Sequence, residues 1–288
     1  MSWKNQVYIL VISSIMKKEL ALREIQIGEL GVLKKIKEIC TKANIEYFLM
    51  WGTLIGAIRH KGIIPWDDDI DIGMLRPEYE RFISYCQKNE KDLFPYKLYH
   101  YTTHKKYIYP IARFVDTRYK IDYNDTVDYD LGLFVDVYPF DGCGNTLKER
   151  DNTFKAVRGN LLPFISLGVR TNVLFNHGVL NYCVKTVMWV IAKMIGQNWM
   201  IRRIDERAKR ECDINSHYVN CVIWDTTHSL MFPRKAFKEL IDAPFENDIF
   251  KIPKGYDEIL RLEYGDYMQL PPEEERIGHH YYKAYRKL

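Results

Sequence analysis

The 288-residue sequence contains no C-x-x-C pair, no internal repeat and no low-complexity linker. Its six cysteines are scattered, so we expect free, buried thiols in a reducing compartment rather than a zinc site or a disulfide framework. No run of five like charges occurs, and 42 basic against 38 acidic residues leave a net charge of only +4. This balance gives no basis for a nucleic-acid partner, although it is compatible with anionic substrates.

Long hydrophobic runs are also missing. The first apolar run, Val7 to Met16, is far shorter than the ~20 residues that span a bilayer, and no small-residue cleavage signal follows it. We expect it to begin an N-terminal helix. The apolar stretch Val179 to Ile195 carries Lys185 and Lys193, which favours a buried packing helix, with an interfacial membrane helix as the alternative. We therefore predict a cytoplasmic protein, with peripheral association at the inner face of the membrane left open.

Periodicity predicts a mixed α/β first half. Helical spacing covers Glu19 to Cys40, where one face would carry Leu20, Ile27, Leu30, Leu33, Ile36 and Ile39. The segment between Tyr96 and Val137 is rich in Tyr, Ile, Val and Phe and predicts several strands. Four shorter elements are expected between these two segments: strand Ile45 to Met50, helix Leu54 to Arg59, strand Ile70 to Leu75 closed by Pro77, and helix Tyr79 to Gln87.

The pattern changes near Leu147. Helical spacing dominates from Arg150 to Arg210, short strands return after Tyr218, and a last helix runs from Gly255 to Tyr264 before Gly265. We predict an α+β fold with a mixed sheet and flanking helices. It would divide into a catalytic core with its N-terminal helix (1–146), a helical region (147–215), and C-terminal strands and a helix that complete the site (216–288).

Four aspartates lie within five residues after Trp66. If Asp69-Ile70-Asp71-Ile72 is a strand, alternation places Asp69 and Asp71 on one face and both isoleucines in the core. Two such carboxylates can converge on a hard cation such as Mg²⁺, whose remaining ligands are water and phosphate oxygens. We therefore expect Asp69 and Asp71 to be catalytic metal ligands, and Asp67 and Asp68 to be solvated turn or capping residues.

A third carboxylate would complete a metal site or accept a proton. Asp136 is the best candidate because it is a lone acid within the apolar run Leu131 to Tyr138, where an unpaired charge is costly. The alternative is a buried ion pair with an arginine such as Arg113.

Phosphate-binding groups are expected just before the aspartates. Gly52 and Thr53 precede a helical turn and offer backbone N–H groups and a hydroxyl to phosphate oxygens. Arg59 and Lys61 lie between this pair and the aspartates, where they could neutralise a pyrophosphate. Solvation at the surface explains both cations equally well.

The string from Trp51 to Met74 resembles the signature of the LicD family of phosphocholine transferases, to which the fukutin-related proteins are also similar. More broadly, Gly52-Thr53, then Asp69-x-Asp71 and a distant Asp136 resemble the three-part pattern of the nucleotidyltransferase superfamily. The resemblance extends to further strings near both ends: Leu22 to Gln26, Cys40, Phe134 to Asp141, and Tyr264 to Pro272.

This resemblance implies a nucleotidyltransferase-like mixed sheet that carries the three aspartates and depends on Mg²⁺ or Mn²⁺. It also implies a CDP-alcohol donor, most simply CDP-choline, CMP as leaving group, and a saccharide acceptor, such as a lipid-linked teichoic-acid or lipopolysaccharide precursor. At matching positions Asp69 and Asp71 would hold metal, and Asp136 would hold metal or act as base. Tyr264 and Asp266 would contribute to substrate binding.

Choline itself would require an aromatic cage, because a quaternary ammonium donates no hydrogen bond. The chain is 14% aromatic, and four residues neighbour the motifs: Trp51, Trp66, Tyr138 and Tyr264. Each could equally be core or strand filler. Phosphocholine transfer is thus the favoured function, with ribitol or glycerol phosphate as other passengers. Nucleotidyl transfer to a small molecule and a catalytically inactive glycan- or membrane-binding protein are the rival hypotheses.

Overall fold

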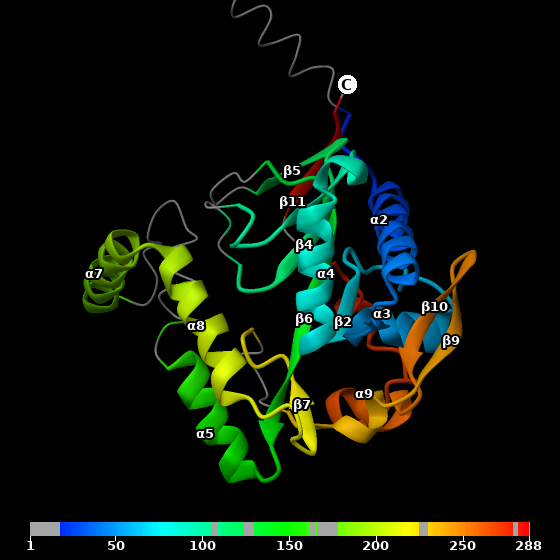
Figure 1. The fold of residues 1–288 in the computed structure, drawn as a ribbon. Coiled ribbons are helices and arrows are strands. Elements are labelled where there is room, and N and C mark those ends of the chain that lie inside the picture. Colours follow the sequence, from blue (N-terminus) through cyan, green and yellow to red (C-terminus); the bar gives the residue numbers. More distant parts are fainter. Residues whose placement is uncertain are drawn as a thin grey trace, which may run out of the picture.

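The computed structural model describes residues 18–104, 107, 109–123, 130–159, 161, 165, 178–224, 230–278 and 282–287. The expected start of an N-terminal helix at Val7 to Met16 lies outside these residues. The described part is an α+β fold, as predicted: a mixed sheet flanked by helices on both sides (Figure 1).

The main sheet has the strand order β1-β2-β6-β4-β3, in which only the β2–β6 pair is parallel. The long strand β6 continues beyond this sheet to pair with β7, which in turn pairs with β8. Two further antiparallel pairs, β9–β10 and β5–β11, lie outside this path. The strands are β1 Phe48–Leu49, β2 Asp71–Leu75, β3 Tyr96–Tyr99, β4 Ala112–Asp116, β5 Tyr119–Tyr123, β6 Leu133–Gly144, β7 Tyr218–Asn220, β8 Phe232–Pro233, β9 Leu240–Phe245, β10 Asp248–Pro253 and β11 Tyr282–Arg286.

The helices agree with the predicted positions to within a few residues. The predicted helix over Leu54 to Arg59 begins earlier, at Trp51, and its second half is a π-helix. Pro77 lies in the first turn of α4, where its missing N–H costs nothing. The helices are α2 Leu22–Ala43, α3 Trp51–Ile55, η1 Gly56–His60, α4 Arg76–Lys88, η2 Glu90–Leu93, α5 Leu147–Arg158, α7 Val179–Ile195, α8 Gln197–Glu211, η3 Arg234–Phe237, α9 Tyr256–Tyr264 and η4 Glu273–Glu275.

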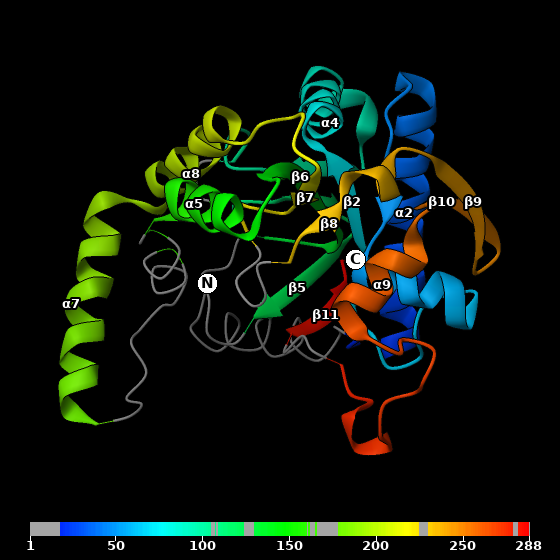
Figure 2. The same cartoon turned by 90° about the horizontal axis from the view of Figure 1, so that it is seen from below.

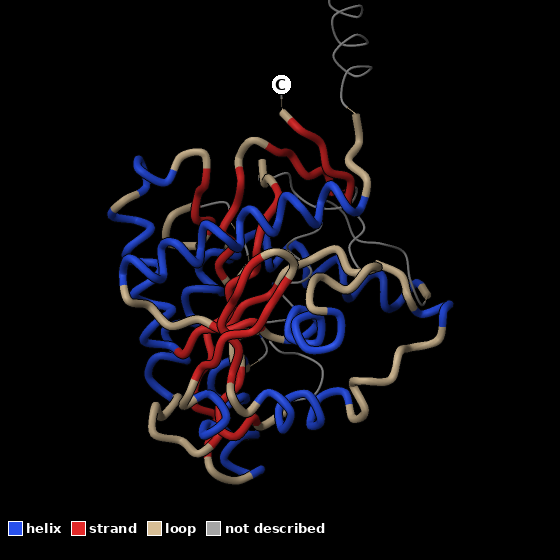
Figure 3. The backbone as a smooth tube through the Cα atoms, turned by 90° about the vertical axis from the view of Figure 1, so that its right-hand side faces the viewer, coloured by secondary structure: helices blue, strands red, loops and turns tan. Residues whose placement is uncertain are grey.

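Helix α2 packs on the sheet and carries the β9–β10 hairpin on the same side of the molecule (Figure 3). Lys34 and Lys37 donate to Asn247 and Asp248 at 2.8 and 2.7 Å, which fixes the tip of the hairpin to the helix. Asn44 ends α2 in the left-handed conformation. The predicted apolar face is wrong at Ile27, which is 56% exposed, because the buried stripe instead includes the polar residues Gln26 and Glu29.

Helix α7 differs from the prediction of a buried packing helix. Of its 17 residues only Ala192 is buried, and Leu180 and Met194 are each 80% exposed. It lies away from the sheet, and its principal contact among the described elements is α8 (Figures 1 and 2). Within the described residues, no single helix is long and apolar enough to cross a bilayer, although α7 and α8, bent by 80°, pass that test as a pair.

A buried polar cluster joins α8 to the core. Arg76 donates to Asp141 through two nitrogens at 2.7 and 2.6 Å, and to Asp205 at 2.7 Å. Asp205, only 1% exposed, also accepts from the Tyr101 hydroxyl at 2.6 Å and pairs with Lys209 at 2.9 Å. Although burial opposes ionisation, these cations and hydrogen bonds lower the pKa of Asp205 to about 2.

Replacing Asp205 is therefore expected to destabilise the fold. Asp205→Ala leaves Arg76 short of a buried partner and should lower the free energy of unfolding by about 3–5 kcal/mol, measured by urea denaturation at pH 7. Since the folded-state pKa is depressed, the difference from wild type should shrink as the pH falls from about 4 toward 2. Glu206→Ala on the exposed side of α8 is the matched control. Equal stability of the two variants would contradict an anchoring role for the cluster.

Candidate active site

The acidic segment between Trp66 and β2 folds into a compact cluster. One carboxylate oxygen from each of Asp67, Asp68 and Asp69 lies within 4.8 Å of the others. Ile70 and Ile72 are buried, as the alternation predicted. Three negative groups this close repel one another unless a cation lies among them.

Sheet register places three more charged side chains beside this cluster. On the parallel pair β2–β6, Asp71 lies opposite Asp136, and on the antiparallel pair β4–β6, Arg113 lies opposite Asp136. Neighbouring strands are about 5 Å apart, so the three residues form one row across the sheet. Arg113 donates to both oxygens of Asp136, at 2.6 and 3.3 Å. The ion pair considered from the sequence is thus present, and it lies beside Asp71 rather than away from it.

Asp71 is the residue whose environment best fits a bound cation. Among the described residues, no group hydrogen-bonds its buried Oδ1. Burial and the charges of Asp69, Asp136 and Asp67 raise the pKa of Asp71 well above its usual range, and Arg113 only partly opposes them. Clustered carboxylate oxygens are the ligands that Mg²⁺ and Mn²⁺ prefer, so the residues present fit a divalent cation.

Asp67 and Asp68 are not solvated turn residues, and the prediction for them is wrong. Asp68 is 8% exposed, and a side chain on Gly278 would meet its carboxylate. Burial, the charge of Asp69 and a hydrogen bond with Asp69 raise the pKa of Asp67 to about 8. The turn that follows Pro65 folds back onto α2 and α3, so it brings these side chains inward.

Gly52 and Thr53 hold this cluster in place. A Cβ at Gly52 would lie 2.7 Å from Asp67 Oδ2, so only glycine allows this carboxylate to approach the backbone so closely. The buried Thr53 hydroxyl accepts a hydrogen bond of 2.8 Å from the Asp71 N–H. Both residues therefore contact the aspartates directly. These contacts are compatible with the predicted binding of substrate phosphates, but they exist without a bound phosphate.

The two cations predicted to bind a pyrophosphate, Arg59 and Lys61, make contacts with the C-terminal part of the chain. Arg59 donates to the carbonyls of Tyr267 and Gln269 at 2.7 and 3.0 Å, so it anchors the C-terminal segment to η1. Lys61 is exposed, and its carbonyl accepts from the Glu246 N–H. Their contact with a pyrophosphate stays a prediction.

The two C-terminal residues predicted to bind substrate, Tyr264 and Asp266, differ in their position relative to the aspartates. Burial of the hydroxyl and the charges of Glu263, Asp71, Asp67 and Asp69 raise the pKa of Tyr264, so the hydroxyl lies within electrostatic reach of the aspartate cluster although the residue as a whole is 43% exposed. Asp266 is exposed and its charge acts on Arg261 instead. The structure thus brings Tyr264 to the acids and leaves Asp266 outside.

Helix α2 contributes two residues that sequence reasoning did not select. Gln26 donates to the Asp67 carbonyl at 2.7 Å and so positions the acidic turn. Glu29 is fully buried; its Oε1 accepts from Tyr282 at 3.2 Å, and its Oε2 has no partner among the described residues. Burial and the charge of Asp69 raise the pKa of Glu29 strongly. Polar residues at an i, i+3 spacing on the buried side of a helix were the available signal.

Aromatic side chains border the acids. Trp51 and Tyr138 pack edge to face with ring centroids 4.4 Å apart, and the charges of Asp71, Asp136 and Asp69 act on the Tyr138 hydroxyl. Trp51 has a φ of 50°, which is costly for a bulky residue and fixes its ring beside Tyr138. Trp66 instead lies under Arg276 and beside His60.

Comparison with known proteins agrees with this site. Residues 44–160, which carry the acidic cluster, Asp136 and Trp51, match the family model described as LicD/FKTN/FKRP, nucleotidyltransferase domain. Lipopolysaccharide cholinephosphotransferase LicD of Haemophilus influenzae is 32% identical over 287 residues, which cover 93% of this chain and 99% of the relative. The chain belongs to the LicD family. The family resemblance and the nucleotidyltransferase-like fold inferred from the sequence are thereby confirmed.

More distant relatives of this LicD-family protein match shorter segments. Human ribitol 5-phosphate transferase FKRP is 44% identical over 54 residues, 19% of this chain and 10% of the relative. An uncharacterised protein of Rickettsia prowazekii is 38% identical over 82 residues, 22% of this chain and 31% of the relative. The two relatives with stated activities both transfer a phosphorylated alcohol.

Proposed function

We propose that this protein transfers phosphocholine from CDP-choline to a hydroxyl of a saccharide and releases CMP. The observation that carries the proposal is the row of Asp71, Asp136 and Arg113 beside the Asp67–Asp69 cluster. Phosphoryl transfer needs neutralisation of charge on phosphate oxygens, and carboxylates that collect around a divalent cation supply it. The similarity along nearly the whole length of a cholinephosphotransferase supports the choice of passenger.

The roles of individual residues follow from their positions. Mg²⁺, or Mn²⁺, would be held by Asp69 and Asp71 with Asp136 beside them, and would neutralise the pyrophosphate of the donor. We propose that Asp136 supports this set rather than acting as base, because both of its oxygens accept hydrogen bonds from Arg113. Thr53 fixes the start of β2, and Gly52 gives Asp67 the space it occupies.

Product identity tests this proposal. The purified protein is incubated with Mg²⁺, a lipopolysaccharide preparation and CDP-choline, CDP-ribitol or CDP-glycerol, and the product is examined by ³¹P NMR. We expect a phosphodiester that joins choline to a sugar. A ribitol or glycerol phosphodiester alone would keep the reaction type and change the passenger, and a product that carries the nucleotide would overturn phospho-alcohol transfer.

The choice of choline gives a separate prediction for Trp51. A quaternary ammonium over an aromatic face gains ~0.5–2 kcal/mol, so Trp51→Leu should raise KM for CDP-choline roughly 3- to 30-fold. CDP-glycerol, which has no cation, should lose little. Trp199→Leu on α8, where the Trp199 side chain is 54% exposed, is the matched control. An equal loss with both donors would show that Trp51 serves packing against Tyr138 rather than choline recognition.

We propose that the protein works in the cytoplasm and contacts the inner face of the membrane through α7. Its exposed apolar side chains accompany Lys185 and Lys193, and the helix contains no acidic residue. Sedimentation with vesicles that contain anionic lipid should therefore exceed sedimentation with neutral vesicles. Val187→Asp should reduce it severalfold, whereas Asp71→Asn should leave it unchanged. Equal sedimentation of the wild-type protein and the Val187→Asp variant would contradict the proposed contact.

A further inference from the structure

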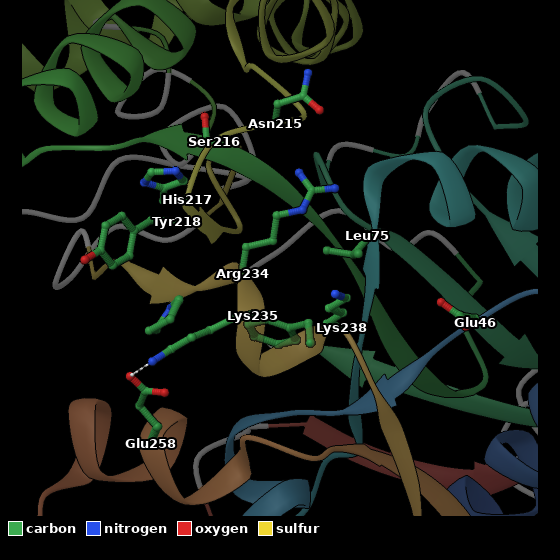
Figure 4. A pocket seen from close by; sticks show the side chains of 12 residues that line it. Glu46, Leu75, Asn215, Ser216, His217, Tyr218, Arg234, Lys235, Lys238 and Glu258 are labelled. Carbon is green, nitrogen blue, oxygen red and sulfur yellow. Dashed lines mark ion pairs between the residues drawn. The ribbon is translucent and has the colours of Figure 1, made fainter.

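Two adjoining pockets lie at the end of β2 opposite the aspartates. They have volumes of about 640 and 510 Å³ and share the lining residues Glu46, Leu75 and Arg234. Figure 4 shows the larger of the two pockets, in which the Arg234 guanidinium extends toward Asn215, whereas Lys235 extends toward Glu258. Its lining includes residues from η3, from the segment after it and from the segment before β1, so the pocket forms only in the folded chain.

The cations in the larger pocket differ in their partners. Lys235 pairs with Glu258 at 3.3 Å, which neutralises both. No side chain among the described residues forms an ion pair or hydrogen bond with the Arg234 guanidinium or the Lys238 ammonium. Arg234 is partly buried, and its backbone N–H donates to the His217 carbonyl at 2.8 Å, which fixes the residue at the pocket wall. Two cations that face a cavity without partners can hold a phosphate or carboxylate.

The remaining lining is that of a saccharide site. Glu46 and Asn215 offer acceptors and donors for hydroxyl groups, and Tyr218 adds an aromatic ring (Figure 4). The charged and neutral groups therefore suit a sugar that carries one anionic group better than a bare anion.

The pocket lies within reach of the aspartates. From Asp71 to Leu75 along β2 is about 13 Å, and from Glu258 to Tyr264 along α9 is about 9 Å. Helix α9 contacts α3, whose Gly52 and Thr53 adjoin the aspartates, and Glu258 of α9 lines the pocket. An oligosaccharide spans such a distance, whereas a single sugar does not.

We propose that this pocket binds an anionic sugar of the acceptor, so that a neighbouring sugar of the same chain reaches the aspartates. Arg234 and Lys238 hold the anionic group, and Glu46 and Asn215 bind hydroxyls. The assignment of this ligand to the acceptor depends on the proposed function, whereas the binding of an anionic saccharide does not.

Direct binding tests the proposal without any donor. Glucose 6-phosphate, glucose and inorganic phosphate are titrated into the full-length protein, and binding is followed by NMR chemical-shift changes. We expect glucose 6-phosphate to bind more tightly than either other probe, and less tightly as salt rises. Arg234→Gln should weaken it roughly 10- to 100-fold, Lys238→Gln should weaken it less, and Arg286→Gln on β11 should have no effect.

Three results would overturn the proposal: unchanged affinity in Arg234→Gln, glucose that binds as tightly as glucose 6-phosphate, or inorganic phosphate that does so. Lys238→Gln gives a second test because Lys238 is exposed and its replacement leaves the fold intact. Selective binding of glucose 6-phosphate by a protein that transfers no phospho-alcohol would refute the proposed function and leave the anionic-saccharide site in place.

Discussion

Asp71→Asn should abolish turnover without destabilising the protein. The loss is expected to reach about 10³-fold or more. The substitution removes the carboxylate charge that would hold the cation, and this cation would neutralise the reacting phosphate. Stability should stay equal or rise, since the native fold holds Asp71 buried among like charges, with its pKa raised well above the usual range. Turnover is measured as CMP release and stability by urea denaturation.

The matched control for this prediction is Asp122→Asn on β5, which removes an aspartate charge that is partly exposed and pairs with Lys120. It should change neither quantity. A near wild-type rate of Asp71→Asn at saturating Mg²⁺ would contradict the role of Asp71 as a metal ligand, and a loss of stability equal to the loss of activity would indicate a structural role instead.

Asp136→Asn is expected to lower turnover by about 10²-fold or more, and donor affinity far less. Its interpretation needs Arg113, since the substitution also breaks a buried ion pair. Arg113→Gln breaks the same pair and keeps the carboxylate. Both variants should therefore lose comparable stability, whereas only Asp136→Asn should lose most of its turnover.

The comparison of the two variants separates chemistry from packing. Single-turnover rates and donor Kd are measured for each, with the free energy of unfolding measured in parallel. If Arg113→Gln loses turnover to the same extent, the ion pair rather than the carboxylate is what the reaction requires. If Asp136→Asn changes only the donor Kd, Asp136 serves binding.

Local patterns predicted the elements that carry the site. The alternation Asp69-Ile70-Asp71-Ile72 reports burial directly, since Ile70 and Ile72 are 1% and 0% exposed. The inward fold of Asp67 and Asp68 depends on contacts with α2 and with Gly278, which lie far along the chain. No short window of sequence contains those contacts.

Pairing and exposure were also set by tertiary structure. Arg113 and Asp136 were considered as partners, but the register that places this pair opposite Asp71 depends on the strand order. The apolar composition of α7 suits a buried helix as well as an exposed one, and only its position beside α8 distinguishes them. The role of Glu29 was not predicted, because one buried acid does not change the average polarity of a 22-residue helix.

Metal-dependent CMP release from CDP-choline tests the central claim most directly. The purified protein is incubated with CDP-choline and a saccharide acceptor, with Mg²⁺ or with EDTA, and CMP is quantified over time. The account predicts release with Mg²⁺, none with EDTA, and recovery when Mg²⁺ is restored in excess. Release at the same rate in EDTA would contradict it, because the clustered aspartates would then have no cation to hold.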